Sequence, residues 1–163
     1  MKEKYIELIS VKQDYLFNGP KKYVDDIKKM LNDEVLSKVK VEEKESDNSA
    51  QFNLGVLGNN DGKHLFINVA FVYSYKRNYR SDPNYYSILG KFESLMESEE
   101  DIKNIDDFNV FVNENLFTLV KPIMNSISKT ISEITADTLD YPNQLDIYNV
   151  FKRKYEKKSE NKN

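Results

Sequence analysis

The hydrophobic and polar positions of the chain first alternate and later repeat every three or four residues. The clearest alternation covers residues 65–75, in which every second side chain is large and apolar. Because successive side chains of a β-strand point to opposite faces, this pattern predicts a strand with one continuous apolar face. That face consists of Leu65, Ile67, Val69, Phe71, Tyr73 and Tyr75. The other face also carries apolar residues, Phe66, Ala70 and Val72, so we expect a central strand.

Three weaker patterns predict strands around it. Residues 5–17 alternate loosely and stop at an Asn-Gly-Pro turn signal. Residues 52–56 alternate before the Asp-Gly pair at 61–62, which favours a hairpin because both residue types tolerate the positive φ of a primed turn. Residues 85–95 form a further strand, in which Gly90 indicates a bulge or a close backbone approach.

Two segments show helical spacing. Residues 21–39 are rich in lysine and carry apolar residues every three or four positions, which predicts a helix through about Leu36. A longer helix is capped by Asp106 or Asp107, and it kinks or restarts at Pro122 because proline lacks the N–H of an inner helical turn. Its apolar stripe consists of Leu116, Leu119, Val120, Ile123, Ile127, Ile131 and Ile134.

This order of elements predicts an α+β fold. Strands come first and the long helix comes last, which favours an antiparallel sheet of about four strands with the helix packed on one face. With 163 residues, the chain has the size of one domain. The fold that we expect is therefore a single sheet with a long C-terminal helix.

The composition excludes several classes of function. The net charge of −3 gives no global attraction to nucleic acid or to an anionic membrane. The absence of cysteine excludes disulfides, thiolate zinc sites and cysteine nucleophiles. The chain has neither the apolar core of a signal peptide at its start nor eighteen consecutive apolar residues, so we expect a cytoplasmic protein.

Catalytic and metal-binding patterns are also missing. The one histidine, His64, follows the predicted hairpin turn, and no second ligand or nucleophile is spaced around it. The acidic run at residues 97–101 lacks the glycine and the alternation of a calcium loop. The glycines form no phosphate-binding motif. We therefore expect no enzyme, no cofactor and no metal.

Residues 73–80 carry the one pattern that favours nucleic acid. Their tyrosines are interleaved with lysine and arginine, a mixture typical of proteins that bind single strands. However, Tyr73 and Tyr75 continue the apolar face of the predicted strand, and the chain is acidic overall. Single-stranded nucleic acid is therefore a remote alternative partner.

Several stretches resemble SecB, the ATP-independent bacterial export chaperone, and its relatives. Residues 5–20 are similar to the opening segment of that family, which ends in Phe-x-x-Pro, here Phe17 and Pro20. Gly90 and Phe92 match a Gly-x-Phe step at the end of its paired strands. A related firmicute family of undescribed function shares a pattern matched here by Leu119, Pro122, Asn125, Leu139, Asp140 and Pro142.

The resemblance implies a domain organisation. A single SecB-like domain would cover residues 1–151, with 21–44 as an apparent insertion. The basic residues 152–163 would then form a disordered tail.

The resemblance also implies a function. A SecB-like protein would hold unfolded or partly folded polypeptide in apolar grooves without ATP. It would serve either general protein export or one dedicated client, such as the antitoxin of a toxin–antitoxin pair. A different class, an adaptor of SecB-like fold without chaperone activity, is the alternative. The candidate client-binding residues, for each of which ordinary core packing is the other interpretation, are Ile6, Leu8, Tyr15, Phe17, Phe66 and Val72.

The long helix has a second face that is small and neutral. In SecB-like proteins the long helices of neighbouring subunits pack together, and small side chains would permit a close approach in a dimer or tetramer. A solvated face is the alternative interpretation. The candidate interface residues are Asn125, Ser128, Ser132 and Ala136.

Overall fold

The computed structural model describes residues 6–41, 49–59, 61–79, 82–99, 102, 104–139 and 142–160. Its middle layer is a four-stranded antiparallel sheet in the order β1-β4-β3-β2. The strands are β1 (Ile6–Pro20), β2 (Ser49–Gly58), β3 (His64–Tyr79) and β4 (Asp82–Ser98). The predicted α+β fold with one antiparallel sheet is thus confirmed.

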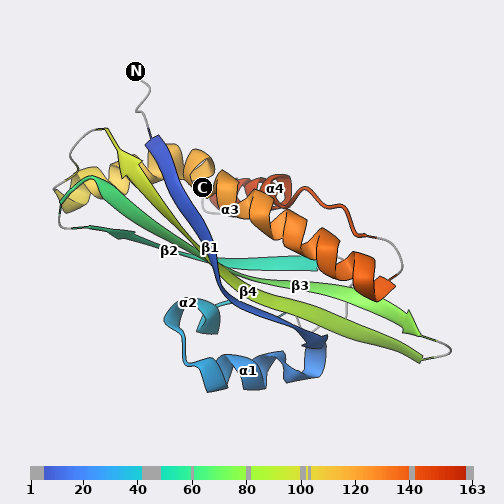
Figure 1. Cartoon of the computed structure of the whole chain (residues 1–163). Helices are drawn as coiled ribbons and strands as arrows, with labels where there is room; N and C mark the ends of the chain where they lie inside the picture. The colour runs from blue at the N-terminus through green and yellow to red at the C-terminus, as the bar shows by residue number, and fades with distance from the viewer. Residues whose placement is uncertain are drawn as a thin grey trace.

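Helices cover the two faces of the sheet unequally. The long helix α3 (Ile105–Leu139) and α4 (Ile147–Glu160) lie on one face (Figure 1). A short 3-10 turn (Lys21–Tyr23), α1 (Val24–Leu31) and α2 (Glu34–Ser37) lie on the other. Among the described helices, none combines the length and the hydropathy of a membrane span.

The main core lies between the sheet and α3. The apolar face of β3 that the alternation predicts is buried there, from Leu65 through Tyr75. Ile88, Phe92 and Met96 of β4 extend the same face. Most of the predicted stripe on α3 is buried against these strands, namely Leu119, Val120, Ile123, Ile127 and Ile131.

Gly90 on β4 marks a close approach within this core. A Cβ built at Gly90 would lie 2.6 Å from the ring of Phe71 and 3.3 Å from the carbonyl oxygen of Tyr15. No real Cβ atom fits at the shorter distance, so the position needs glycine. The close backbone approach expected at Gly90 is confirmed.

The long helix starts at an earlier residue than predicted, and it continues through Pro122. It begins at Ile105, and Asn104 accepts a hydrogen bond from the Asp106 N–H at 2.9 Å. Pro122 lies inside a single helix and does not start a new one. Burial of the apolar stripe on both sides of Pro122 outweighs the one backbone hydrogen bond that proline removes.

The predicted helix at 21–39 is present as two short helices. Asn32 adopts a left-handed conformation with φ of 50° and ends α1. Asp33 then caps α2, because its Oδ1 accepts hydrogen bonds from the N–H groups of Val35 (2.9 Å) and Leu36 (3.0 Å). An Asn-Asp pair can end one helix and start the next, and the apolar spacing alone does not reveal the break.

The prediction of a disordered tail from residue 152 is wrong for residues 152–160. They continue α4, which starts at Ile147. Phe151 anchors this helix in a group of aromatic rings, with centroids 5.7 Å from Phe52 and 6.2 Å from Phe117. Lys154 donates a hydrogen bond to the Ala50 carbonyl on the edge strand β2. These contacts hold a basic segment that charge alone would leave in solvent.

Candidate client-binding surface

An apolar row crosses the face of the sheet opposite α3. Leu57 of β2 pairs with Phe66 of β3, and Phe66 pairs with Leu95 of β4. Directly paired residues point to the same face, so the three side chains lie side by side. Leu57 is 64% exposed, Phe66 and Leu95 are half-buried, and none of them belongs to either hydrophobic cluster of the structure. We call these three residues the apolar row.

The next row inward is polar. Asn68 pairs with Gly55 on one side and with Glu93 on the other. Glu93 forms an ion pair with Lys12 of β1 at 3.6 Å. Asn68 is 7% exposed, and its Oδ1 accepts no hydrogen bond from any residue that the structure describes. A buried acceptor without a donor is unfavourable, so this position is a point of local instability.

Charged residues lie beside the apolar row, between it and the turn that connects β2 to β3. His64 Nδ1 contacts Asp61 Oδ2, and its Nε2 lies 3.9 Å from Glu97 Oε2. The N–H groups of Lys63 and His64 and the His64 ring donate hydrogen bonds to Asp61, which lowers the pKa of this carboxyl to about 2. Asp61 thus holds the hairpin through its side chain, and among the described residues of the turn only Gly62 takes a positive φ, of 72°. The predicted hairpin is present without the positive φ expected of Asp61.

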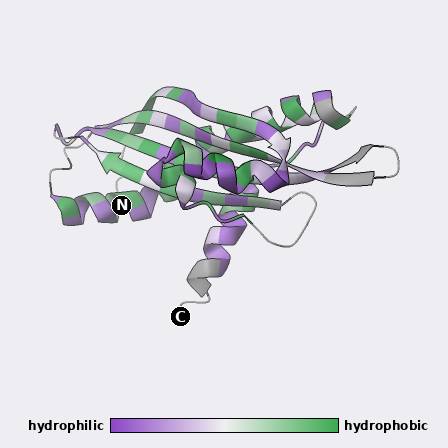
Figure 2. Ribbon diagram, turned by 90° about the horizontal axis from the view of Figure 1, so that it is seen from below, coloured by the Kyte–Doolittle hydropathy of each residue, from purple (hydrophilic) through white to green (hydrophobic). Residues whose placement is uncertain are grey.

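Beyond the polar row, the same face is covered by α1 and α2. Val24, Leu36 and Val39 pack on Ala70, Val72 and Leu89 of the sheet. Tyr15 and Phe17 of β1 contact the edge of this group. We call Ala70, Val72, Leu89, Tyr15 and Phe17 the covered patch, and residues 21–41 the helical cover. Figure 2 shows α1 and α2 lying across only part of the strands on this face.

The helical cover is tied to the sheet by polar contacts. Lys91 Nζ of β4 lies 2.8 Å from Asp33 Oδ2, and Asn53 Nδ2 of β2 donates to the Val35 carbonyl at 2.9 Å. Burial would raise the pKa of Asp33, but hydrogen bonds from Lys91 and from the N–H groups of α2 outweigh it and hold the pKa below 3.8. Asp33 is therefore ionised at neutral pH and pairs with Lys91.

The six predicted client-binding residues do not form one surface. Phe66 belongs to the apolar row, whereas Tyr15, Phe17 and Val72 lie in the covered patch. Val72 is only 3% exposed because the helical cover packs on it. Two residues near the start of β1 complete the set: Ile6 packs against the main core, and Leu8 is 43% exposed.

Sequence reasoning missed two members of the apolar row, Leu57 and Leu95. Both lie out of phase with the apolar alternation of their own strands, which follows Phe52, Leu54 and Val56 in β2. Nothing within one strand shows that two such positions and Phe66 meet on one face. The strand register brings them together.

The neutral face of α3 contacts a segment of its own chain. Ser128 Oγ accepts a hydrogen bond from the Ile147 N–H at 3.0 Å, and Thr135 Oγ1 accepts one from Asn143 at 2.7 Å. Asn143 Nδ2 also donates to the Tyr73 hydroxyl at 3.0 Å. These serine and threonine side chains therefore bind the segment that connects α3 to α4.

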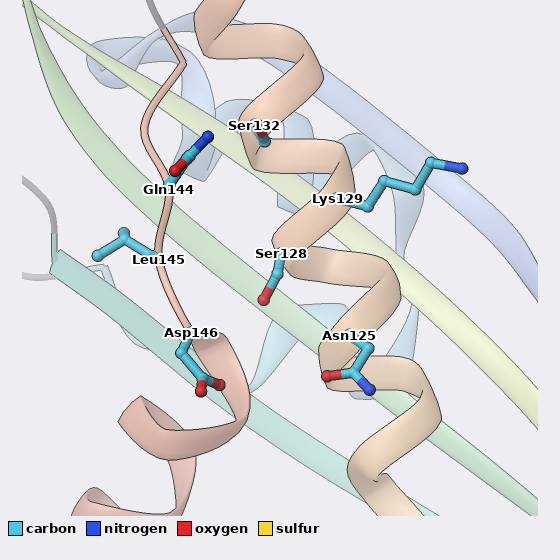
Figure 3. A pocket seen from close by; sticks show the side chains of 7 residues that line it. All are labelled: Asn125, Ser128, Lys129, Ser132, Gln144, Leu145 and Asp146. Carbon is cyan, nitrogen blue, oxygen red and sulfur yellow. The ribbon is translucent and has the colours of Figure 1, made fainter.

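The same face lines a shallow pocket of about 440 Å³. Asn125, Ser128 and Ser132 of α3 border it on one side and the segment 144–146 on the other (Figure 3). Asn125 is exposed, whereas Ser128, Ser132 and Ala136 are half-buried. Part of the predicted interface face is thus already in contact within the chain.

Two further observations concern other kinds of site. Tyr73 and Tyr75 are fully buried in the main core, so they cannot stack on bases of a single-stranded nucleic acid. Within the described ranges, no three histidine, aspartate or glutamate side chains converge as ligands of a metal ion would.

Comparison with known proteins supports the assignment of the fold. No protein-family model and no curated protein sequence matches the chain. Among solved structures, it is similar to the SecB-like chaperone Rv1957 of Mycobacterium tuberculosis, in complex with a ChAD peptide from the HigA1 antitoxin Rv1956. That match has a TM-score of 0.55 and 8% identity over 86% of this chain and 88% of the chaperone.

A second solved structure is similar over nearly its whole length. It is a protein of unknown function from Streptococcus agalactiae, with a TM-score of 0.50 and 10% identity over 88% of this chain and 98% of that one. The fold is thus that of a class of α+β proteins with a four-stranded sheet and a long helix. Within that class, the chain has the SecB-like fold, as the sequence resemblance predicts.

Proposed function

We propose that this protein is an ATP-independent chaperone that holds unfolded or partly folded polypeptide on the apolar row. The observation that carries the proposal is the row itself, a line of large apolar side chains across three strands, of which Leu57 is exposed and Phe66 and Leu95 are half-buried. An exposed apolar surface on a folded protein favours a binding function. The chain is also similar in structure to a SecB-like chaperone that was solved with a bound peptide, and this similarity supports the same function.

The size of the row favours weak binding at each site. Because Phe66 and Leu95 are already half-buried, complete burial of the row would contribute less than the roughly 4.5–9 kcal/mol of three fully exposed side chains. Association costs roughly 4–15 kcal/mol in lost freedom of motion, so one row holds a client weakly. Several rows in a homo-oligomer, a dimer or tetramer, would grip one unfolded chain more tightly, because later contacts are intramolecular.

Dedication to one client is the finer form of this proposal. The similar chaperone was solved with a peptide from an antitoxin. An antitoxin and a toxin gene beside the gene of this protein would support the same role here. Their absence, together with suppression of aggregation of several unrelated proteins, would favour general protein export.

The test is light scattering from an aggregation-prone protein diluted out of denaturant, with and without this protein and without ATP. We expect suppression near a stoichiometric ratio, and its loss in the double variant Leu57→Ser with Phe66→Ser. Ile105→Ser is the control, because Ile105 is an apolar residue at the start of α3 on the other face, and it is at least as exposed as Leu57. Absence of suppression by the wild-type protein would overturn general chaperone activity. Equal suppression by the double variant would remove the apolar row from the mechanism.

A further inference from the structure

The helical cover is held to the sheet by fewer apolar contacts than α3. Its buried side chains are Val24, Leu36 and Val39, and they form a cluster separate from the main core. Small local clusters open at a lower free energy than the core of a protein, because less apolar area is exposed on opening. The helical cover therefore has the physical character of an element that separates from the sheet while the rest stays folded.

The outer side of the cover is itself unusual. Met30 is 83% exposed, and Tyr23 and Leu31 are also exposed, all of them within or next to α1. Three of the large apolar side chains that the protein exposes thus lie in one short segment. The cover presents apolar groups on the side that faces away from the sheet as well as on the side that faces it.

The sheet surface beneath the cover has features of a binding site. It offers an apolar group of strand residues and the two aromatic rings of Tyr15 and Phe17. Beside it lies Asn68, which is nine-tenths buried and whose Oδ1 has no donor among the described residues. A Cβ at Gly55, next to Asn68, would lie 3.2 Å from Val35 Cγ2, so the cover lies directly over this position. An extended polypeptide has the N–H groups that Asn68 Oδ1 lacks in the closed structure.

We propose that the covered patch is a second client-binding site, which the helical cover fills in the closed structure. An extended apolar segment of unfolded polypeptide displaces the cover and binds the patch in its place. This inference rests on the proposed chaperone function and adds a regulated site to it. The covered patch continues the apolar row across the polar row of Asn68, so displacement would lengthen the surface available to one client. The ion pair of Asp33 with Lys91 holds the closed form.

The absence of cysteine allows a clean test of this displacement. Val35 Cγ2 lies 3.2 Å from the Cβ position of Gly55, which suits a disulfide in the double variant Val35→Cys with Gly55→Cys. The disulfide would lock the cover on the sheet, and reduction would release it in the same molecule. Circular dichroism and urea unfolding of both forms confirm that each is folded.

The measurement is the affinity for fluorescently labelled, reduced and carboxymethylated α-lactalbumin, a permanently unfolded polypeptide. We expect the oxidised form to bind at least about fivefold more weakly than the reduced form, because the competent state is no longer populated. Asp33→Asn, which removes the ion pair but keeps a capping oxygen, should bind about two- to fivefold more tightly than wild type. Glu34→Gln is the control, because Glu34 is exposed and its one ion pair with a residue that the structure describes is with Lys38 at 3.6 Å.

The outcomes separate this inference from the function on which it rests. Equal binding by the oxidised and reduced forms would overturn displacement of the cover and leave the chaperone function with the apolar row alone. Failure of every form to bind would overturn the chaperone function itself, and the inference with it. Unchanged affinity of Asp33→Asn would show that the ion pair does not hold the cover closed.

Discussion

Asp33 shows how one side chain connects a local structure to a tertiary contact. One carboxylate oxygen caps α2, and the other pairs with Lys91 at 2.8 Å on the neighbouring sheet. Both interactions require or favour the ionised form, and together they outweigh the effect of burial on its pKa. A residue that looks like an ordinary helix cap in the sequence therefore also holds the helical cover on the sheet.

The lowered pKa of Asp33 predicts a pH dependence of stability. Because the folded-state pKa lies below the unfolded value of 3.8, the carboxylate stabilises the fold fully above pH 3.8, and this contribution is lost as pH falls through the folded-state pKa. At pH 7, Asp33→Asn should lower the free energy of unfolding by roughly 1 kcal/mol. The difference from wild type should shrink toward zero as the pH is lowered below 3.8, measured by urea unfolding at a series of pH values.

The exposed neighbour Glu34 supplies the control for this prediction. Its only ion pair among the described residues is the surface contact with Lys38. Glu34→Gln should therefore change the stability little at any pH. A constant difference between Asp33→Asn and wild type from pH 7 to the acid limit would show that the charge of Asp33 does not contribute.

At the scale of elements, α4 illustrates how aromatic contacts hold a segment whose composition resembles a free tail. The ring centroid of Phe151 lies 5.7 Å from that of Phe52, 6.2 Å from that of Phe117 and 6.1 Å from that of Tyr155. The rings of Phe117 and Tyr155 are also in contact, at 5.5 Å. Lys152 places its Nζ 5.4 Å from the centroid of Phe117. Lys152 of α4 thus lies beside an aromatic ring, whereas Arg153 and Lys157 are exposed to solvent.

Removal of the Phe151 ring tests this account of α4. Phe151→Ala should lower the free energy of unfolding by about 3–5 kcal/mol, because it leaves a cavity between β2, α3 and α4. The variant should also be cleaved by trypsin within residues 152–157 faster than wild type. Tyr155→Ala, at a more exposed position that contacts the rings of Phe117 and Phe151, should cost about 0.5–1.5 kcal/mol. Similar effects of the two substitutions would contradict the anchoring role of Phe151.

At the scale of the whole molecule, the two faces of the sheet differ in how they are covered. The face under α3 and α4 contains the main core, whereas the opposite face carries the apolar row and the covered patch. The small neutral face of α3 partly binds the chain's own segment 143–147. Contact with a second subunit would use the part that remains accessible, which includes Asn125.

The predicted oligomer has a direct test that spares the internal hydrogen bond of Ser128. The double variant Asn125→Glu with Ser132→Glu should have the mass of one subunit, 19.1 kDa, in size-exclusion chromatography with light scattering, whereas wild type should have a multiple of it. Like charges brought together across a two-fold contact would repel each other, and the larger side chains would prevent close approach. Asp137→Arg, at an exposed position on another side of α3, is the control. A mass that does not change would show that this face is not the interface.

The sequence pattern predicts which helices and strands are present better than it predicts where they begin and end. The alternation from Leu65 to Tyr75 predicts β3 correctly, since a buried strand face leaves a period of two in the sequence. The break at Asn32 and the continuation of α4 past Phe151 were not predicted. The break has a local cause, the left-handed Asn32 followed by the Asp33 cap, whereas the continuation of α4 depends on Phe52, a packing partner that lies far away in the chain.

The residues of the candidate site were harder to predict from the sequence than the fold, because tertiary structure decides which of them meet. Amino-acid pattern alone was sufficient for the α+β class, the main core face and Phe66 as a candidate, because each is recorded in local periodicity. Register brought Leu57 and Leu95 beside Phe66, and packing of the helical cover buried Val72. Neither has a local signature, because pairing between strands and docking of helices depend on the summed contacts of residues that are distant in the chain.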